Sequence, residues 1–250
     1  SKSCITTACG VTKFFTFVSM FKQRSAVLTT IVVVIALLGV RHARADMAGG
    51  VLATPSGAST QAQARMRYVA AGDMHTCVVL HNGSVKCFGL GADGQLGNDT
   101  GLDSGYSTSS SVATTAAIEL GLRRTARAIA VGLAHSCALL DNFTVKGWGF
   151  GAYGRLGYGD TVSRGDGAGE MAALVAIDFG TDRTATAIAV GSSHSCALLD
   201  NSAVKCWGRN QYGQLGYGDT DSRGDGAGDM GDALLAIDFG TGRTARAIAA

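Results

Sequence analysis

The sequence predicts an all-β protein built from repeated blades, a β-propeller, and its repeats and its glycine content support this class. Closely similar segments recur three times, and their marker histidines lie 60 and then 59 residues apart: His75, His135 and His194. Repeats of this period are stacked supersecondary units, each burying its apolar face against a neighbour. Glycine occurs 36 times and proline once, which suits short strands joined by glycine turns better than helices.

Each unit contains four short apolar runs separated by turns, as in a propeller blade of four antiparallel strands. In the first unit, Asn82-Gly83 marks the hairpin between the second and third runs, because both residues tolerate positive φ. The predicted first strands are 68–71, 128–131 and 187–190; examples of the others are 195–199, 204–208, 174–177 and 234–237. Residues 243–250 predict the opening strand of a fourth unit. The repeats lie near 67–126, 127–185 and 186–245, within a propeller domain at 65–250.

The recurring letters G-x-x-H-[ST]-C-x-L, V-K-C-W-G and G-[QR]-L-G resemble the repeat of the regulator of chromosome condensation family, over residues 67–250. The resemblance implies a seven-bladed propeller, so we expect the three units to be part of a propeller that continues beyond Ala250. Family members act as guanine-nucleotide exchange factors, as parts of larger signalling proteins, or as a secreted inhibitor of β-lactamase. They share a broad protein-binding face, and the fold does not fix one activity.

The N-terminal part predicts a secretory signal peptide at 20–45. Lys22 and Arg24 precede an apolar run at 26–40, and Ala43-Arg44-Ala45 supplies small residues for cleavage. An uncleaved signal anchor is the alternative, although the run is shorter than the roughly 18 apolar residues of a spanning helix. Residues 1–19 are an extension of unclear status, and 46–64 read as a flexible linker. We therefore expect a location outside the cell or on its outer face, with membrane contact only through this segment.

The cysteines predict one cross-strand disulfide in each of two hairpins. Cys77 and Cys87 flank the first hairpin, and Cys196 and Cys206 flank the third at the same spacing of ten. A turn centred on Asn82 would place the first pair opposite each other on adjacent strands. The second unit keeps one cysteine, Cys137, but has glycine at position 147. A secretory route favours the disulfides, while the alternative is that these cysteines are small buried apolar residues.

Several repeated residues are predicted to be blade scaffold. Each marker histidine stands two residues before a cysteine, which could suggest zinc, but ligands from different blades would lie far apart. We therefore expect no metal and predict that each imidazole hydrogen-bonds to loop backbone where the first two strands join. The remaining scaffold residues are inter-blade aromatics and leucines: Trp148, Trp207, Leu96, Leu156 and Leu215.

The second and third units carry a long glycine-rich insertion before the fourth run. Each insertion contains an Arg-Gly-Asp tripeptide, a weak adhesion motif, and the candidate binding residues are Arg164, Asp166, Arg223 and Asp225. Asp219, Asp221, Asp225 and Asp229 suggest a calcium loop, but Arg223 and Met230 stand where oxygen ligands are required. We expect these insertions to be exposed loops on one rim that are free to bind a partner.

Candidate glycosylation sites lie in predicted turns or loops, at Asn82, Asn98 and Asn142, and would be modified only in a eukaryotic secretory route.

Beyond residue 45 the chain carries 15 basic and 19 acidic residues. This balance argues against nucleic acid as a partner, since no counterion-release energy favours binding to phosphates.

No catalytic constellation is evident, because the candidate polar residues recur with the repeat as scaffold residues do. We therefore expect no enzyme activity and no cofactor, and predict a non-catalytic module that binds a protein or a glycan through its rim loops. Two alternatives are a guanine-nucleotide exchange regulator of a small GTPase, as the resemblance implies, and a part of a larger enzyme or inhibitor protein. The predicted signal peptide argues against the GTPase, which resides in the cytosol or nucleus.

Overall fold

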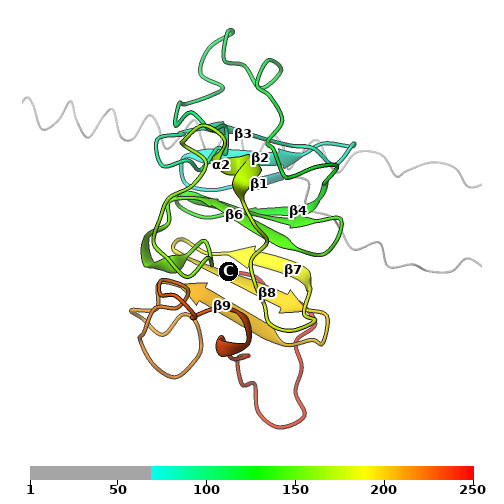
Figure 1. Cartoon of the computed structure of the whole chain (residues 1–250), viewed down its shortest axis with the longest axis vertical. Coiled ribbons are helices and arrows are strands. Elements are labelled where there is room, and N and C mark those ends of the chain that lie inside the picture. Colours follow the sequence, from blue (N-terminus) through cyan, green and yellow to red (C-terminus); the bar gives the residue numbers. More distant parts are fainter. Residues whose placement is uncertain (1–68) are drawn as a thin grey trace, which may run out of the picture. The chain divides into compact units, whose positions relative to one another are not determined.

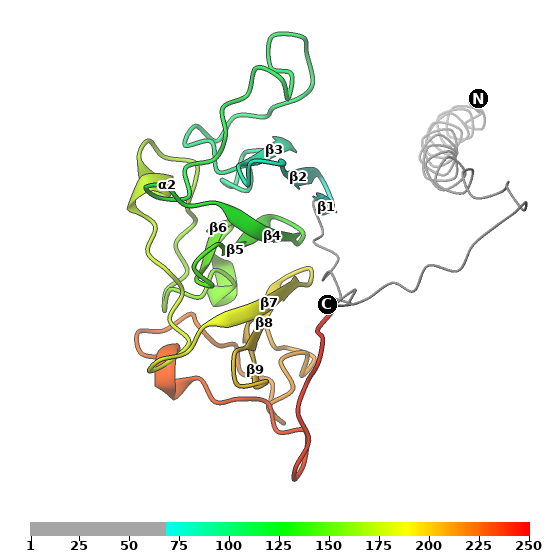
Figure 2. The same ribbon diagram turned by 90° about the vertical axis from the view of Figure 1, so that its right-hand side faces the viewer.

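A computed structural model describes residues 69–250, whose strands form three separate antiparallel sheets (Figure 1). In each sheet the strand order follows the chain. The strands are β1 (Val69–Ala71), β2 (His75–Val79) and β3 (Val85–Gly89); β4 (Ala126–Val131), β5 (His135–Leu140) and β6 (Val145–Gly149); and β7 (Ala185–Val190), β8 (His194–Leu199) and β9 (Val204–Gly208). Figure 2 shows the sheets following one another as neighbouring blades. The predicted all-β blade fold is confirmed.

Some predictions lie outside the described residues. These are the extension at 1–19, the signal segment at 20–45, the linker at 46–64 and the first residues of the propeller domain. Among residues 69–250, helical structure is limited to α2 (Glu170–Ala173) and the 3₁₀ turns η1 (Ala152–Gly154) and η2 (Gly231–Ala233). No helix in this range is long and apolar enough to cross a bilayer.

The hairpin registers follow the sequence pattern closely. β2 and β3 pair with Cys77 opposite Cys87, and β8 and β9 pair with Cys196 opposite Cys206. The predicted first strands of the second and third blades begin too late in the sequence. β4 and β7 each start two residues earlier than predicted, with a bulge inside the first three residues that the apolar pattern does not reveal.

The predicted fourth strands are wrong. Residues 174–177 and 234–237 form no strand. Each segment makes one backbone hydrogen bond to the neighbouring strand, 2.8 Å from Ile177 N–H to Val145 O and from Ile237 N–H to Val204 O. A tyrosine hydroxyl takes the place of further pairing. Tyr217 Oη lies 3.1 Å from the backbone oxygen of Cys206 in β9 and 3.0 Å from that of Leu235. The inserted side chain holds the two backbones together but keeps them too far apart for a ladder.

The predicted opening strand at 243–250 is also absent as a strand. The start of this segment nevertheless makes the same backbone contact as the first strands of the earlier units. Ala126, Ala185 and Ala245 each donate their N–H to a backbone oxygen in the hairpin turn of the preceding blade. β4 and β7 pair with the second strand of their own unit, and no strand among the described residues lies in that position beside residues 243–250.

The apolar cores lie between consecutive blades. One cluster joins Cys77, Val85 and Leu96 of the first unit to Trp148 and Met171 of the second. The next joins Val145 of the second unit to Trp207 of the third, where the rings of Phe179 and Trp207 lie 5.6 Å apart. Burial between blades explains why the repeats stack, since each blade leaves an apolar face that its neighbour covers.

Candidate functional site

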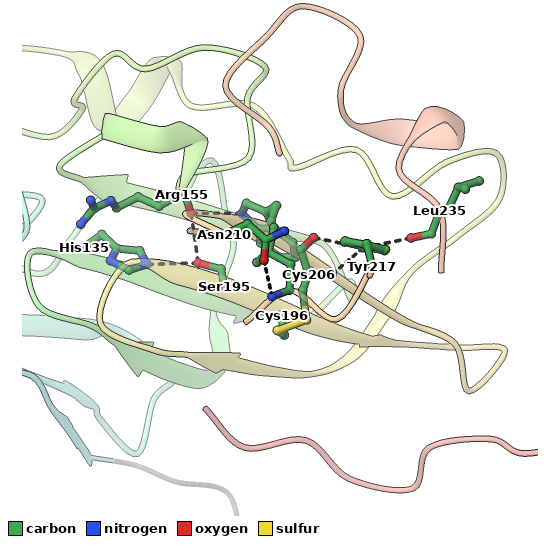
Figure 3. The surroundings of a disulfide bond; sticks show 10 residues. His135, Arg155, Ser195, Cys196, Cys206, Asn210, Tyr217 and Leu235 are labelled. Atoms are coloured by element: carbon green, nitrogen blue, oxygen red, sulfur yellow. Dashed lines mark hydrogen bonds between the residues drawn. A yellow bond between two sulfur atoms is a disulfide. The ribbon is translucent and has the colours of Figure 1, made fainter. Parts of the chain in front are cut away.

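Two hairpins are closed by disulfides. Cys77 is bonded to Cys87 and Cys196 to Cys206, with Cα atoms 4.1 Å apart in both pairs. Figure 3 shows the second bond beside the Ser195 and Tyr217 contacts. The predicted disulfide pairing is confirmed. In the first hairpin, a turn centred on Asn82 sets the register that brings the two cysteines opposite each other.

The second hairpin has the same register without the bond. Cys137 stands opposite Gly147 and is the free cysteine among the described residues. Its thiol is fully buried, and this burial raises its pKa to about 12. A protonated, enclosed thiol is a poor nucleophile, so Cys137 acts here as a small apolar residue.

Two of the marker histidines, His75 and His135, connect consecutive blades, so the prediction that they hydrogen-bond to loop backbone where the first two strands join is wrong for these two. His75 Nε2 lies 2.9 Å from Ser136 Oγ of the next blade, and His135 Nε2 lies 3.1 Å from Ser195 Oγ. The serine hydroxyl donates in turn to a backbone oxygen of the preceding blade, Gln95 or Arg155, at 3.0 Å. Figure 3 shows the His135–Ser195–Arg155 chain. The partner serines lie 61 and 60 residues away in the sequence, so the local pattern could not reveal them.

The two tryptophans at the end of the third strands bind the same backbone oxygens between the blades. The indole N–H groups of Trp148 and Trp207 donate to the same two backbone oxygens, at 3.1 and 3.0 Å. Leu96, Leu156 and Leu215 are also fully buried, as predicted. Burial lowers the pKa of His75 to about 4 and that of His135 to about 3, so both imidazoles are neutral at physiological pH.

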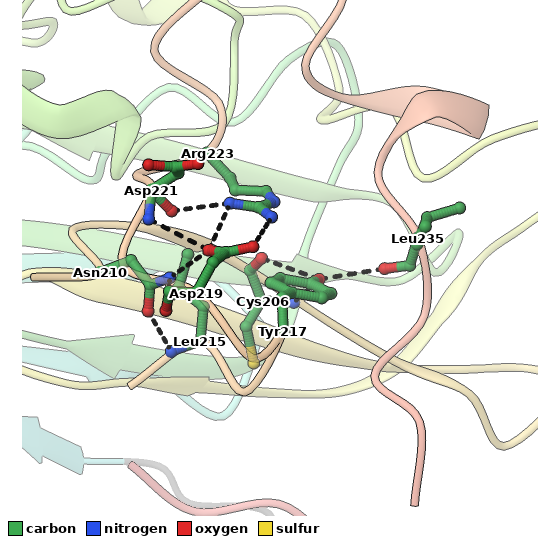
Figure 4. A network of polar contacts seen from close by, with 8 residues as sticks. All are labelled: Cys206, Asn210, Leu215, Tyr217, Asp219, Asp221, Arg223 and Leu235. Carbon is green, nitrogen blue, oxygen red and sulfur yellow. Dashed lines mark hydrogen bonds and ion pairs between the residues drawn. The ribbon is translucent and has the colours of Figure 1, made fainter. Parts of the chain in front are cut away.

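The arginines of the Arg-Gly-Asp tripeptides are engaged within their own loops. Arg164 donates two hydrogen bonds to the Asp160 carboxylate, at 3.0 and 2.7 Å, and lies 4.5 Å above the Tyr158 ring. Arg223 repeats both contacts with Asp219 and Tyr217 (Figure 4). The bidentate pairs lower the pKa of Asp160 and Asp219 and hold each guanidinium along the loop.

The insertions also contact the preceding blade. Asp99 of the first unit accepts the N–H groups of Gly169 and Met171 at 3.1 and 3.0 Å, and the backbone at Arg164 passes close to Gly94. Gly154 makes the equivalent close contact with Gly224 in the third unit, where a side chain would collide. The insertions are therefore inter-blade connections, although the side chains of Asp166 and Asp225 remain exposed.

The candidate glycosylation residues lie in loops or turns, with Asn82 and Asn142 exposed. In both cases the asparagine Oδ1 accepts from the hydroxyl two residues later, at 2.7 Å from Ser84 and 2.8 Å from Thr144. Asn98 is partly buried and donates to Leu102 O. Within residues 69–250, no three His, Cys, Asp or Glu side chains are grouped to hold a metal ion.

One end of the blades presents exposed apolar and aromatic side chains, and we call this end the loop face. The turn before β2, β5 or β8 meets the segment after the third strand here, through bonds such as Phe150 N–H to Ala134 O at 2.8 Å. The exposed large side chains of the loop face are Met74, Leu133, Phe150, Tyr153 and Tyr212, the last at 85% exposure. Arg155 and Arg209 lie among the aromatic rings.

Sequence reasoning missed several residues of these networks. The signal for Ser136 and Ser195 was present, because each follows a marker histidine at the same position in its repeat. Tyr158 and Tyr217 likewise recur two residues after the buried leucine. Arg155 and Arg209 could have been singled out because each differs from the residues at the same position in the other two repeats. Only the structure shows that their side chains meet at one tyrosine ring.

Comparison with known proteins agrees with this architecture. The sequence model of the regulator of chromosome condensation (RCC1) repeat matches residues 67–95 and 185–214. The chain carries RCC1 repeats. It is 30% identical to the ultraviolet-B receptor UVR8 of Arabidopsis thaliana over 155 residues, covering 62% of this chain and 32% of UVR8. It is 29% identical over 150 residues to the human E3 ubiquitin-protein ligase HERC2, covering 60% of this chain and 3% of HERC2.

Solved structures show the same kind of similarity. Human WBSCR16 is 24% identical with a TM-score of 0.47, over 63% of this chain and 38% of that protein. Prp20p of Saccharomyces cerevisiae, a protein studied for its binding to Gsp1p and histones, is 23% identical with a TM-score of 0.45, over 61% and 34%. The chain thus spans about a third of UVR8 and a much smaller part of HERC2.

Proposed function

We propose that this RCC1-repeat protein is a non-catalytic module that binds a protein partner through the loop face. The observation that carries the proposal is the division of its side chains into two groups. The polar residues that recur in the repeats form hydrogen bonds between neighbouring blades, as in the His135–Ser195 contact. The loop face instead exposes aromatic side chains beside arginines, and tyrosine and arginine are enriched among residues that dominate binding energy.

The rim insertions are a weaker candidate than the sequence suggested. A guanidinium held by its own carboxylate and stacked on a tyrosine would have to break both contacts before it could bind a ligand. We therefore place the main contact surface on the loop face, with the insertions as supports at its edge. A glycan partner is less well supported than a protein, since no feature of the insertions specifies a sugar.

Photo-cross-linking tests this proposal directly. A benzophenone amino acid replaces Tyr212 on the loop face or, as the matched control, Phe143 in a hairpin turn at the opposite end of the blades. The full chain is exposed to proteins of its source organism. We expect adducts from position 212 that are absent from position 143. Equal adducts at both positions, or none at either, would exclude the loop face as the binding surface.

We also propose that the protein acts in an oxidising compartment outside the cytosol. The two disulfides support this, because such bonds persist mainly in secreted proteins. The alternative, nucleotide exchange on a small GTPase, would place the chain in the cytosol or nucleus, where thiols are kept reduced. Locating a C-terminally tagged chain and determining its mature N-terminus tests the proposal. A cytosolic chain with reduced cysteines that accelerates nucleotide release from a GTPase would establish the alternative instead.

A further inference from the structure

The second blade departs from its neighbours at a residue that supports the loop-face turn. Gln95 Oε1 accepts the N–H of Asp93 at 2.8 Å, and Gln214 Oε1 accepts the N–H of Tyr212 at 2.9 Å. The second blade has Arg155 at this position, and a guanidinium cannot accept a hydrogen bond. Arg155 instead donates from Nε to Ala152 O at 2.9 Å, and Tyr153 adopts a φ of 62° that neither counterpart shows.

Arg155 is a buried charge without a matching carboxylate. The residue is 2% exposed, and within the described range of 69–250 its Nη1 has no hydrogen-bond partner and no acidic group lies within ion-pair distance. Burial lowers the pKa of Arg155, and the neighbouring Arg209 lowers it further, while Tyr153 and Asp93 act in the opposite direction. A buried charge is costly unless it is paired, so replacing glutamine by arginine at a scaffold position disfavours folding at this point.

A second departure meets the first. Arg209 stands where the other blades have Leu90 and Phe150, and its guanidinium lies 4.9 Å from the Tyr153 ring centre. Arg155 lies 5.8 Å from the same ring and 4.9 Å from that of Phe150. Arg209 Nε is also buried without a partner. Arg209 also donates from Nη2 to Gln211 Oε1, but neither arginine has an ion-pair partner among residues 69–250. Two arginines without a carboxylate therefore share one tyrosine at the junction of the second and third blades, and the exposed rings of Tyr153 and Tyr212 lie on the turns that follow the third strands of these blades.

We infer that this arginine–tyrosine cluster, made by Tyr153, Arg155, Arg209 and Tyr212, binds an acidic peptide segment of the protein partner. A carboxylate would supply the negative charge that the two guanidinium groups lack, and apolar side chains of the peptide would contact the tyrosine rings. Because Arg155 is nearly fully buried, it attracts the peptide carboxylate through its charge without touching the peptide. Arg209 and the tyrosine rings make the direct contacts with the peptide. This inference deepens the proposed function and rests on it.

The test measures fluorescence anisotropy with a short labelled peptide in which Glu and Leu alternate, against its counterpart with every Glu replaced by Gln. We expect the acidic peptide to bind the full chain and the amide peptide to bind at least about tenfold more weakly. R155Q restores the residue of the other two blades, so it should fold at least as well as the parent and still lose about tenfold in affinity. R209Q should lose a similar factor.

Arg127 provides the matched control, because its guanidinium also lies over an aromatic ring, 4.6 Å from Phe143, at the opposite end of the blades. R127Q should bind the acidic peptide as the parent does. Equal binding of the two peptides, unchanged affinity in R155Q and R209Q, or equally tight binding of a short single-stranded DNA would each overturn the inference. If cross-linking from Tyr212 succeeds while the acidic peptide fails, the proposed function stands and this inference alone is wrong.

Discussion

At the scale of single residues, the three repeats give three versions of each position, and the differences between them show what a residue contributes. The cysteine pair occurs in two hairpins, and in the second hairpin glycine replaces one partner while the register stays the same. The disulfide is therefore an addition to a hairpin that forms without it. Arg155 shows the opposite case, in which a glutamine that supports the turn is replaced by an arginine whose side chain cannot accept the same hydrogen bond.

Gly147→Cys should complete the disulfide of the second hairpin. A Cβ at this position would lie 3.5 Å from Cys137 Sγ, and its main steric cost is an approach of 3.0 Å to Leu156 O. Closing a loop of this length should raise the free energy of unfolding by about 2 to 3 kcal/mol before that cost. Denaturation under non-reducing conditions measures the gain, and intact mass shows whether two hydrogens are lost. An oxidised variant that is less stable than the parent would show that the Leu156 contact outweighs the bond.

At the scale of the strand elements, an inserted tyrosine determines where the sheets end. Tyr158 and Tyr217 place their hydroxyl groups between the third strand and the following extended segment. The runs at 174–177 and 234–237 resemble strands because they are short and apolar. Their burial does not alternate, since Leu174 and Ile177 are buried while the two residues between them are exposed. An apolar run does not reveal this spacing, nor that a tyrosine side chain occupies the space between the two backbones.

Tyr217→Phe should destabilise the third blade by about 1 to 3 kcal/mol. The hydroxyl accepts the Cys206 N–H at 3.1 Å and is close to two backbone oxygens, so its loss leaves backbone groups without partners. Tyr212→Phe is the control, since that ring is 85% exposed. Equilibrium urea denaturation of both variants provides the comparison. Equal stabilities would mean that water replaces the hydroxyl at no cost.

At the scale of the whole molecule, the blades are joined by chains of hydrogen bonds that depend on neutral histidine. The folded-state pKa values of His75 and His135 lie below the unfolded value near 6.5. The unfolded chain therefore binds more protons than the folded chain between pH 6.5 and about 4 for His75, and down to about 3 for His135. Stability rises with pH across this window and falls as the solution is acidified.

Lowering the pH from 7 to 5 should reduce the free energy of unfolding by up to about 2 kcal/mol for each of these histidines. His135→Gln should remove the His135 share of this dependence, whatever its effect at pH 7. His81→Asn is the control, because His81 is exposed in a hairpin turn. Urea denaturation at both pH values checks the difference. A pH dependence in His135→Gln as steep as in the parent would place the acid sensitivity elsewhere.

The sequence by itself determined the repeat, the hairpins, their register and the two disulfides. These depend on residues about ten positions apart, where a glycine turn and alternating burial set the geometry locally. Only the tertiary structure decided the partners of His75 and His135, the absence of the fourth strands and the engagement of Arg164 and Arg223. It also decided that Arg155 and Arg209 meet over one ring. The histidine and arginine–tyrosine contacts join residues of different blades, and the missing fourth strands depend on which side chain fills a gap. The pairs of Arg164 and Arg223 are local but depend on the conformation of their loops. The periodicity of a single repeat specifies none of these.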